Sequence, residues 1–300
     1  MSRHNFLLVL AYDGTDFEGW QRLPGDARSI QGMVETTLSA ILGETIEVTG
    51  AGRTDRGVHA EGQAASFHSR TELRPEAIME KLNAAFPPDI TCRSCREVDP
   101  RFHARFRAKG KVYRYRLHSG PGPDPVSKRF SHHIGALPNL ETMQRAGSRL
   151  LGEHDFGFLS NEKEREDKVR RLDAVRIEES PAPMGRFIDL YFEGPGFLHN
   201  QVRMMAALLL AVGEGKIGEG KLDALLSRAE RAPMPGALGP HGLCLVEVRY
   251  SASDMAYFAG SAGSAGSAGA ARPAGSAGSG QSGYRAWSRT RRSSKPSSAT

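Results

Sequence analysis

The order in which the apolar periodicity changes along the chain is the feature that most constrains its fold. Strand-like patterns stand at residues 5–11, 45–49, 63–67 and 90–98. Helical spacing of apolar residues occurs at 30–42 and 75–85, where Ser29 supplies an N-cap, Gly43 a C-cap and Pro75 a first-turn proline. The first half of the chain is therefore predicted to follow the order βαββαβ.

The second half of the chain repeats this order. Strand-like patterns stand at residues 106–117, 169–178, 186–192 and 243–250, and helical patterns at 140–151, 199–212 and 221–228. Two tandem ferredoxin-like βαββαβ subdomains favour mainly antiparallel sheets that helices cover on one face. We therefore predict an α/β fold of the α+β kind, whose helix-free faces are free to hold a substrate.

The predicted domain boundaries follow from that repeat. Residues 1–103 and 104–252 are the two subdomains, and residues 253–300 are a tail rich in Ser, Ala, Gly and Arg. Such a tail cannot bury enough apolar surface to fold, so we expect disorder there. The 40 basic residues exceed the 34 acidic ones by six, and six basic residues but no acid lie within 259–300. The folded part is thus neutral overall, and any affinity for a polyanion must come from local clustering.

Composition and cysteine usage narrow the classes of protein. No apolar stretch approaches the roughly 20 residues that span a bilayer, so no membrane association is expected. The three cysteines, Cys92, Cys95 and Cys244, are too few for a disulfide framework and indicate a reducing compartment. We therefore expect a cytoplasmic protein, and no zinc site, because neither a second cysteine pair nor a histidine cluster accompanies Cys92 and Cys95.

The densest polar segment is the loop from Gly50 to Ala60, between two predicted strands. Its glycines allow backbone conformations closed to other residues and close approach by a ligand. Asp55 stands between Arg53 and Arg56, whose charges should favour its ionised form. From the pattern alone, a functional carboxylate and an ordinary turn capped by Asp55 are equally supported. Within this loop, Arg53 and His59 are the residues that we expect to contact a substrate.

A basic segment runs from Arg101 to Arg116. Alternate residues of a strand share a face, so Arg107, Lys109 and Lys111 are predicted to lie on the same face as Tyr113. Basic side chains contact phosphates, and an aromatic ring beside them can stack on a base. Because the segment contains no acid, contact with RNA is favoured over a merely solvated strand face.

A third segment runs from Gly194 to Met205, where a glycine-rich turn leads into a mostly apolar helix. Arg203 in such a helix needs a partner, because a buried unpaired charge is very costly. A carboxylate such as Asp55 would be suitable, and an unmatched surface arginine is the alternative.

Together these segments resemble the TruA family of tRNA pseudouridine synthases. The loop Gly52-Arg53-Thr54-Asp55-Arg56-Gly57-Val58-His59-Ala60 matches the signature of that family. Further matches are Val112-Tyr113-Arg114-Tyr115, Phe197-Leu198 with Val202-Arg203, and Gly242-Leu243. The similarity runs from about residue 5 to residue 250.

The resemblance implies an isomerase that converts uridine to pseudouridine in the anticodon stem-loop of tRNA, at tRNA positions 38, 39 and 40. It also implies two α/β subdomains around a central RNA-binding cleft, and a homodimer that uses no metal or organic cofactor. By resemblance, Asp55 is the nucleophile, Tyr113 stacks on the target base, and Arg203 pairs with Asp55. An anionic group near C1′ of the ribose, shielded from water, suits a reaction that breaks a C–N glycosidic bond and remakes it as a C–C bond. Attack of Asp55 on C1′ and assisted loss of the 2′ proton both stay open.

Two other functions are compatible with the same residues. A non-catalytic RNA-binding protein built on tandem RRM-like units would use the basic, aromatic strand but would not need Asp55. A hydrolytic N-glycosidase would release free uracil and would need an activated water. Isomerisation leaves the mass of the RNA unchanged, whereas loss of a base lowers it.

Overall fold

The structure is a computed structural model that describes residues 3–25, 28–161, 167–227 and 235–255. The tail predicted for residues 253–300 lies, from residue 256 onward, outside the described residues. Of the helices in the described ranges, none combines the length and the apolar character that a bilayer crossing requires.

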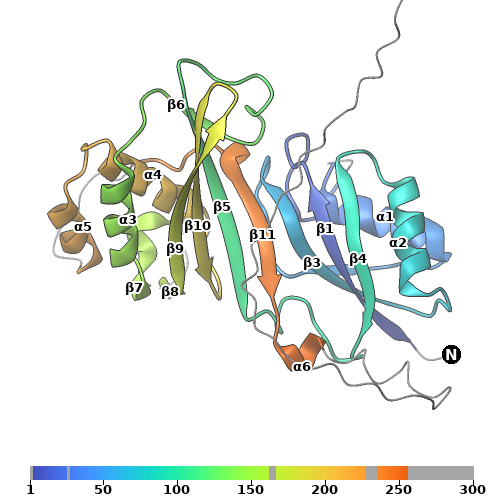
Figure 1. The fold of residues 1–300 in the computed structure, drawn as a ribbon. Helices are drawn as coiled ribbons and strands as arrows, with labels where there is room; N and C mark the ends of the chain where they lie inside the picture. The colour runs from blue at the N-terminus through green and yellow to red at the C-terminus, as the bar shows by residue number, and fades with distance from the viewer. Residues whose placement is uncertain (1–2, 26–27, 162–166, 228–234, 256–300) are drawn as a thin grey trace, which may run out of the picture. The chain divides into compact units, whose positions relative to one another are not determined.

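The first half of the chain has the predicted element order (Figure 1). Its strands and helices are β1 (His4–Tyr12), α1 (Ile30–Leu42), β2 (Val48–Gly50), β3 (His59–Ser69), α2 (Pro75–Ala85) and β4 (Ile90–Val98). Ser29 Oγ accepts a hydrogen bond from the backbone N–H of Gly32, and Gly43 ends α1 with φ of 68°. The local signals that predicted α1 are therefore the groups that hold its two ends.

The second half repeats the order with extra short elements. The main elements are β5 (Gly110–Ser119), α3 (Leu140–Arg149), β9 (Ala174–Ala182), β10 (Gly185–Gly194), α4 (Gln201–Gly213), α5 (Glu219–Leu226) and β11 (Leu243–Arg249). The short ones are β6 (His132–Ile134), β7 (Gly152–Asp155), η1 (Phe156–Leu159), β8 (Val169–Leu172), η2 (Pro240–Gly242) and α6 (Ala252–Met255). Elements of three or four residues are too short to produce a readable apolar period. The sequence therefore predicted β8 only as the start of one strand at residues 169–178, which the structure divides into β8 and β9, and it did not predict the other five short elements.

The long strands form one sheet in the order β4-β1-β3-β11-β5-β10-β9, with β2 paired to β3 and β6 paired to β5. The neighbours are antiparallel except for the parallel pairs β11–β3 and β5–β6. The predicted fold class, a mixed α/β fold with mainly antiparallel pairing, is confirmed. The sequence did not reveal that the last long strand, β11, joins the two halves through pairing with β3 on one side and β5 on the other.

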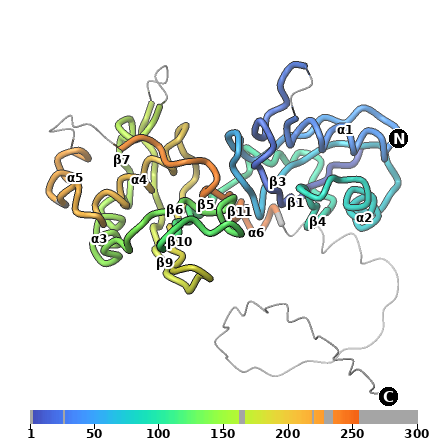
Figure 2. Tube along the Cα trace, turned by 90° about the horizontal axis from the view of Figure 1, so that it is seen from above, coloured from blue at the N-terminus to red at the C-terminus, as the bar shows by residue number. Residues whose placement is uncertain are grey.

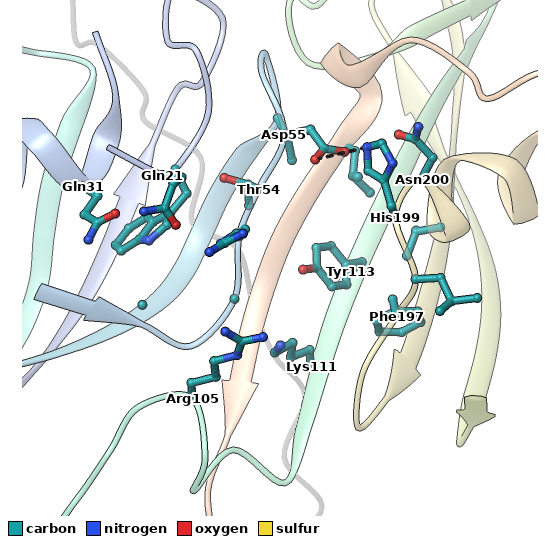
Figure 3. Close-up of a pocket in the computed structure, with 18 of the residues that line it drawn as sticks. Gln21, Gln31, Thr54, Asp55, Arg105, Lys111, Tyr113, Phe197, His199 and Asn200 are labelled. Carbon is teal, nitrogen blue, oxygen red and sulfur yellow. Dashed lines mark ion pairs between the residues drawn. The ribbon is translucent and has the colours of Figure 1, made fainter. Parts of the chain in front are cut away.

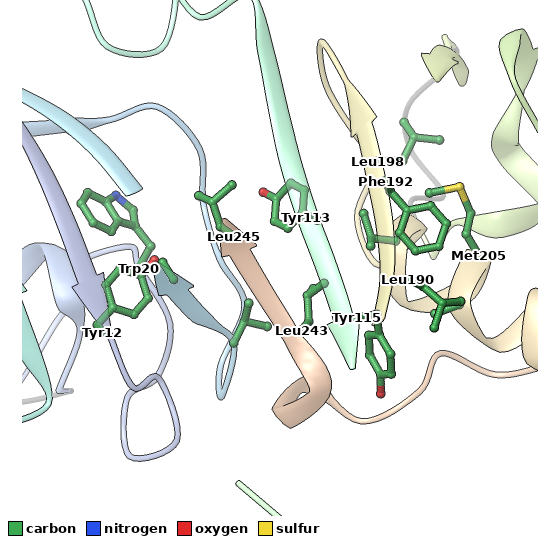
Figure 4. Close-up of a cluster of buried hydrophobic side chains, with 14 of the residues drawn as sticks. Tyr12, Trp20, Tyr113, Tyr115, Leu190, Phe192, Leu198, Met205, Leu243 and Leu245 are labelled. Atoms are coloured by element: carbon green, nitrogen blue, oxygen red, sulfur yellow. The ribbon is translucent and has the colours of Figure 1, made fainter. Parts of the chain in front are cut away.

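A large hydrophobic core lies on the helix-bearing face of this sheet. Figure 4 shows Leu190 and Phe192 of β10 close to Met205 of α4, and all three side chains are fully buried. Helices α1 and α2 lie at one end of the sheet and α3 to α5 at the other (Figures 1 and 2). The middle of this face, around β11, is left without a helix.

Candidate active site

The loop that carries Asp55 connects β2 to β3, and its backbone is fixed by hydrogen bonds. The backbone N–H of Trp20 donates to the carbonyl of Thr54 at 2.9 Å, and the Thr54 hydroxyl bonds the Tyr12 hydroxyl at 2.9 Å. The backbone N–H of Val58 donates to the Asp55 carbonyl at 3.1 Å, which closes a turn. Thr54 is buried, whereas the side chain of Asp55 stays 40% exposed. The loop is thus anchored on both sides of a carboxylate that solvent can reach.

Two glycines allow the segment before α1 to pack against this loop. A Cβ on Gly14 would lie 2.0 Å from the carbonyl oxygen of Val58. Gly19 has φ of 103°, and a Cβ there would lie 2.7 Å from the Thr54 carbonyl oxygen. Because both contacts are with backbone atoms, a side chain at either position would push the Asp55 loop out of place.

A cavity of about 580 Å³ opens beside Asp55 (Figure 3). Its walls come from both halves of the chain, with Gln31 of α1 on one side and Arg203 of α4 on the other. A second hollow of about 350 Å³ shares Asp55 and Arg203 with it. The cavity therefore lies on the helix-bearing face, whereas the expectation from the sequence, that a substrate binds on the helix-free faces, stays a prediction. The cavity can open on the helix-bearing face because the helices cover the two ends of the sheet and leave its middle open.

The charges around the cavity are strongly unbalanced. Among the described residues that line it, Asp55 is the only carboxylate. Four cationic side chains line the same space, namely Arg53, Arg105, Lys111 and Arg203. A cavity of this kind is suited to a polyanionic ligand that meets a single anionic reactive group.

The contacts of Asp55 differ from those that its sequence neighbours suggested. The guanidinium of Arg56 lies 3.4 Å from a carboxylate oxygen of Glu18. The Asp55 carboxylate instead faces the imidazole of His199, with Oδ1 and Nε2 3.9 Å apart (Figure 3). His199 is 54% exposed, so both partners stay accessible to a ligand.

Arg203 lines the same cavity as Asp55 but is held by other groups. Its Nε donates to the carbonyl of Leu238 at 2.6 Å and its Nη1 to Oδ1 of Asn200 at 2.9 Å. Among the ion pairs of the described residues, none joins Arg203 to Asp55. Asn200, with φ of 62°, has the only positive φ of a described non-glycine residue. Asparagine tolerates this left-handed conformation, which orients the start of α4 at the cavity wall.

Tyr113 of β5 forms the floor of the cavity. Its ring meets Phe197 edge to face, with the centroids 5.3 Å apart, and the residue is 8% exposed. Burial raises the pKa of the Tyr113 phenol, and the nearby charge of Asp55 adds to the increase. The phenol is therefore neutral at physiological pH and presents an uncharged aromatic surface within reach of Asp55.

Lys111, two residues before Tyr113, is a cation that has no counterion among the described residues. Burial lowers the pKa of its ammonium, and the charge of Arg105 adds to this effect. Within the described part of the chain, its side chain makes no ion pair and no hydrogen bond. A Cβ on Gly52 would lie 3.0 Å from Lys111 Nζ, so the glycine makes room for this cation beside the Asp55 loop.

His59, which the sequence placed with the substrate-binding residues, does not line the cavity. The pairing of β1 with β3 shifts register, because Leu10 lies opposite Gln63 while Tyr12 lies opposite Ala60. Such a shift reverses which side chains of β3 point to each face of the sheet. The sequence predicted a strand only from residue 63 and placed His59 in the preceding loop, whereas β3 begins at His59.

The contacts of His59 are those of a buried structural residue. Its Nδ1 accepts the N–H of Gly14 at 3.1 Å, and its Nε2 donates to the carbonyl of Arg129 at 2.8 Å. Burial lowers the pKa of this imidazole, whereas Asp13, 3.1 Å from Nδ1, opposes that shift. His59 thus links β3 to the segment that precedes β6, and its contact with a substrate stays a prediction.

In the structure, only part of the basic segment from Arg101 to Arg116 belongs to strand β5. The strand begins at Gly110, so the prediction that it includes Arg107 and Lys109 is wrong. His103 Nδ1 accepts the backbone N–H groups of Arg105 and Phe106, and these hydrogen bonds hold residues 103–107 in a turn. Neither Arg107 nor Lys109 lines the cavity, whereas Arg53, Lys111 and Tyr113 do.

Several lining residues were not named as site residues from the sequence, although Arg105 belongs to the basic segment for which RNA contact was favoured. His199, Asn200, Phe197, Gln31 and Arg105 all reach the cavity (Figure 3). Polar residues at the start of the apolar helix α4 were a visible signal in the sequence. Apolar periodicity, however, cannot show that the starts of two helices from different halves of the chain line the same cavity. The tertiary structure alone brings Gln31 and Asn200 to one space.

Metal-binding chemistry has little support in the described residues. No three His, Cys, Asp or Glu side chains gather there in a group that could hold a metal ion. Cys92, Cys95 and Cys244 are free thiols, and burial raises the pKa of Cys92 to about 12. Cys92 Sγ donates to the carbonyl of Ser94, as a structural thiol does.

Comparison with known proteins bears on the same residues. The sequence profile of a tRNA pseudouridine synthase family matches residues 8–107 and 146–251, which include Asp55 and Arg203. A tRNA pseudouridine synthase A of Geobacter sulfurreducens is 38% identical over 244 residues, which are 81% of this chain and 98% of that protein. One of Acetivibrio thermocellus is 35% identical over 247 residues, 82% of this chain and 99% of that protein. A tRNA pseudouridine synthase A 2 of Bacillus cereus is 34% identical over 248 residues, 82% of this chain and 100% of that protein. With its profile match on both sides of the cavity and full-length relatives, this chain belongs to the tRNA pseudouridine synthase family.

Proposed function

We propose that this protein isomerises uridine to pseudouridine in the anticodon stem-loop of tRNA, at tRNA positions 38, 39 and 40, with Asp55 as the nucleophile. The observation that carries this proposal is the isolation of Asp55, the only carboxylate among the described residues that line a cationic cavity. Membership of a tRNA pseudouridine synthase family supports the reaction and the class of substrate.

The bonds that change determine what the cavity must supply. The target uridine leaves its stack, and a carboxylate oxygen of Asp55 attacks C1′ while the C1′–N1 bond breaks. The electron pair of that bond stays on the detached uracil, which turns until C5 faces C1′. C5 then displaces the carboxylate, loses its proton, and N1 gains one, so the RNA has the same atoms before and after. Water must be excluded meanwhile, because it would trap C1′ and release the base.

The other cavity residues have roles that fit this sequence of steps. Tyr113, a neutral aromatic ring close to Asp55, stacks on the uracil and holds it during the turn. Arg203 exchanges its hydrogen bond to Asn200 for a contact with Asp55 when RNA enters, and so keeps the carboxylate charged away from water. Arg53, exposed at the opening, contacts the RNA backbone.

We propose further that the protein acts in the cytoplasm as a homodimer without a metal or organic cofactor. The support is the resemblance of the Asp55 loop and its partner segments to the TruA family. Sedimentation of the purified chain tests the dimer, and activity after dialysis against a chelator tests the independence from metal ions.

The experiment that tests the function compares wild type with Asp55→Asn on unmodified tRNA transcripts that have uridine at positions 38 to 40. Asp223→Asn is the matched control, because Asp223 is half-exposed, pairs with Arg149 and does not line the cavity. Wild type and Asp223→Asn should form pseudouridine, whereas folded Asp55→Asn should be slower by at least about a thousand-fold.

Three results would contradict the proposal in different ways. Binding of tRNA by wild type with no modification of any transcript favours the non-catalytic RNA-binding protein. A fall in RNA mass by one uracil less the water that replaces it at C1′ favours the hydrolytic N-glycosidase. Full activity of Asp55→Asn would exclude this carboxylate as the nucleophile.

A further inference from the structure

Phe106 is 78% exposed, more than any other aromatic residue among the exposed large hydrophobic residues of the described ranges. It follows Arg105, which lines the cavity beside Asp55. A phenylalanine at this exposure contributes little to the core of its own chain, although single exposed apolar residues are common on protein surfaces. Its position next to a cavity residue, within a basic segment, makes it a candidate for contact with a ligand.

The Phe106 ring is held in a rigid arrangement. It stacks on the imidazole of His103, with the centroids 4.1 Å apart and the planes 24° from parallel. His103 Nδ1 accepts the backbone N–H groups of Arg105 at 3.2 Å and Phe106 at 3.3 Å, and the His103 carbonyl accepts the N–H of Arg107 at 3.0 Å. The turn thus fixes the imidazole, and the imidazole supports one face of the phenyl ring.

The charges near this pair favour an anionic strand. Arg101, Arg105 and Lys109 are exposed within the same segment. Of the acids in this region, Asp99 accepts the backbone N–H of Arg101 and Asp254 lies 3.6 Å from the guanidinium of Arg107. Within the described residues, no ion pair holds Arg101, Arg105 or Lys109. An aromatic platform between free cations is the arrangement that binds single-stranded RNA, where bases stack on rings and phosphates meet the cations.

We infer that the His103–Phe106 pair is a second nucleobase site, on which an unpaired base that neighbours the target uridine in the same RNA strand stacks. This inference rests on the proposed function, since it takes the target uridine to occupy the cavity at Asp55. Arg105 joins the two places, as its side chain lines the cavity while its backbone belongs to the platform turn. The cation holds the phosphate between the two bases, and the platform keeps the strand from re-stacking.

The protein side of the test compares Phe106→Ala, Phe106→Tyr and Val126→Ala. Val126 is the matched control, because it is 84% exposed, aliphatic and absent from the cavity lining. Affinity for an anticodon stem-loop RNA should fall about ten-fold in Phe106→Ala and be retained in Phe106→Tyr and Val126→Ala. The loss should be in KM, with kcat at saturating RNA within about two-fold, because the ring does not touch the reacting atoms.

The RNA side of the test identifies the stacked base. Stem-loops in which one loop nucleotide at a time is abasic are bound to wild type and to Phe106→Ala. At one position next to the target, removal of the base should weaken binding to wild type about ten-fold and leave binding to Phe106→Ala unchanged. If Phe106→Ala binds every RNA as wild type does, or if the losses add at every position, no base stacks there and the inference fails.

Two controls separate this inference from other outcomes. Sedimentation of Phe106→Ala reports whether the ring instead holds a second copy of the chain, and a change of mass with unchanged RNA affinity would overturn the inference. Failure of wild type to form pseudouridine would overturn the proposed function, whereas the binding comparison would still test the stacking site.

Discussion

The two faces of strand β5 carry the same kinds of residue but use them in opposite ways. On one face, Lys111 and Tyr113 line the cavity, and Lys111 has no counterion among the described residues. On the other face, Arg116 makes two hydrogen bonds of 2.7 Å to Asp189, and Arg114 pairs with Glu61 at 2.9 Å. The sequence presents all these cations as one basic segment.

The difference shows that the location of acids on neighbouring strands decides the role of a basic residue. Asp189 of β10 lies opposite Arg116 in the sheet, and Arg114 lies within 4.0 Å of the same carboxylate. Cations with such partners depend on them, because removal of the acid would leave a largely buried charge uncompensated, and they have little charge left for RNA. A cation such as Lys111, placed where strands contribute no acid, is left for an anionic ligand.

The largest expected effect on this comparison comes from Asp189→Asn. The variant leaves Arg116 and Arg114 short of an anion in a largely buried place, so the free energy of unfolding should fall by about 3 kcal/mol. Urea unfolding measures the loss, and Glu178→Gln is the control, because Glu178 is half-exposed and pairs with the half-exposed Arg176. The control should lose less than about 1 kcal/mol. A stable Asp189→Asn protein with reduced kcat would show that the face with Arg114 and Arg116 serves the reaction and not stability, which would contradict the comparison.

The next effect concerns the cavity face. In Tyr113→Leu, kcat/KM for tRNA should fall by about 5- to 150-fold, because a stacking ring is lost, while Tyr113→Phe keeps most activity. Tyr191→Leu removes a tyrosine from the opposite face of β10, where its ring contacts Arg176, and should leave kcat/KM unchanged. Equal losses in Tyr113→Leu and Tyr191→Leu would show that both faces act only through stability.

A smaller effect should come from Lys111→Met. The KM for tRNA should rise about ten-fold, and the dependence of log Kd on log salt should lose about one unit of slope. The free energy of unfolding should not fall, because an unpaired ammonium no longer has to be desolvated. Lys81→Met, an exposed substitution on α2, is the control for a change in net charge. Unfolding of Lys111→Met at lower urea than wild type would indicate a structural role for this cation.

The smallest expected effect is a fall in the free energy of unfolding at acid pH, caused by three histidines near the end of β5. Burial lowers the pKa of His59, of His132 and of His241. In the unfolded chain these imidazoles take up protons below about pH 6.5, where the folded chain still resists protonation. The unfolded state then binds more protons, so stability falls as pH drops below that value toward the lowered folded pKa values.

This loss can be measured as the urea midpoint between pH 7.5 and pH 5.5. Each such histidine contributes at most about 1.4 kcal/mol per pH unit, and His132→Gln should reduce the slope. An unchanged slope in His132→Gln would mean that His132 does not contribute.

Much of the fold could be predicted because it depends on local signals. The cap at Ser29, the left-handed end at Gly43 and the apolar period between them define α1 with no reference to the rest of the chain. The start of β5 could not be predicted in this way, since the turn that delays it depends on the hydrogen bonds of His103. Likewise, the register shift that turns His59 away from the cavity comes from the pairing of β3 with β1.

The candidate site likewise combines features that contiguous residues encode with features that only the tertiary structure sets. The sequence by itself determined the Asp55 loop, its glycines and the tandem βαββαβ order, because each is a property of contiguous residues. Only the tertiary structure decided that β11 closes the sheet between β3 and β5, and that the cavity opens between the two groups of helices. It also decided which cations keep their charge free, because the acids that neutralise Arg114 and Arg116 lie 53 to 75 positions away in the chain. Pairing between distant strands is set by packing and hydrogen bonding over the whole sheet, and no single segment encodes it.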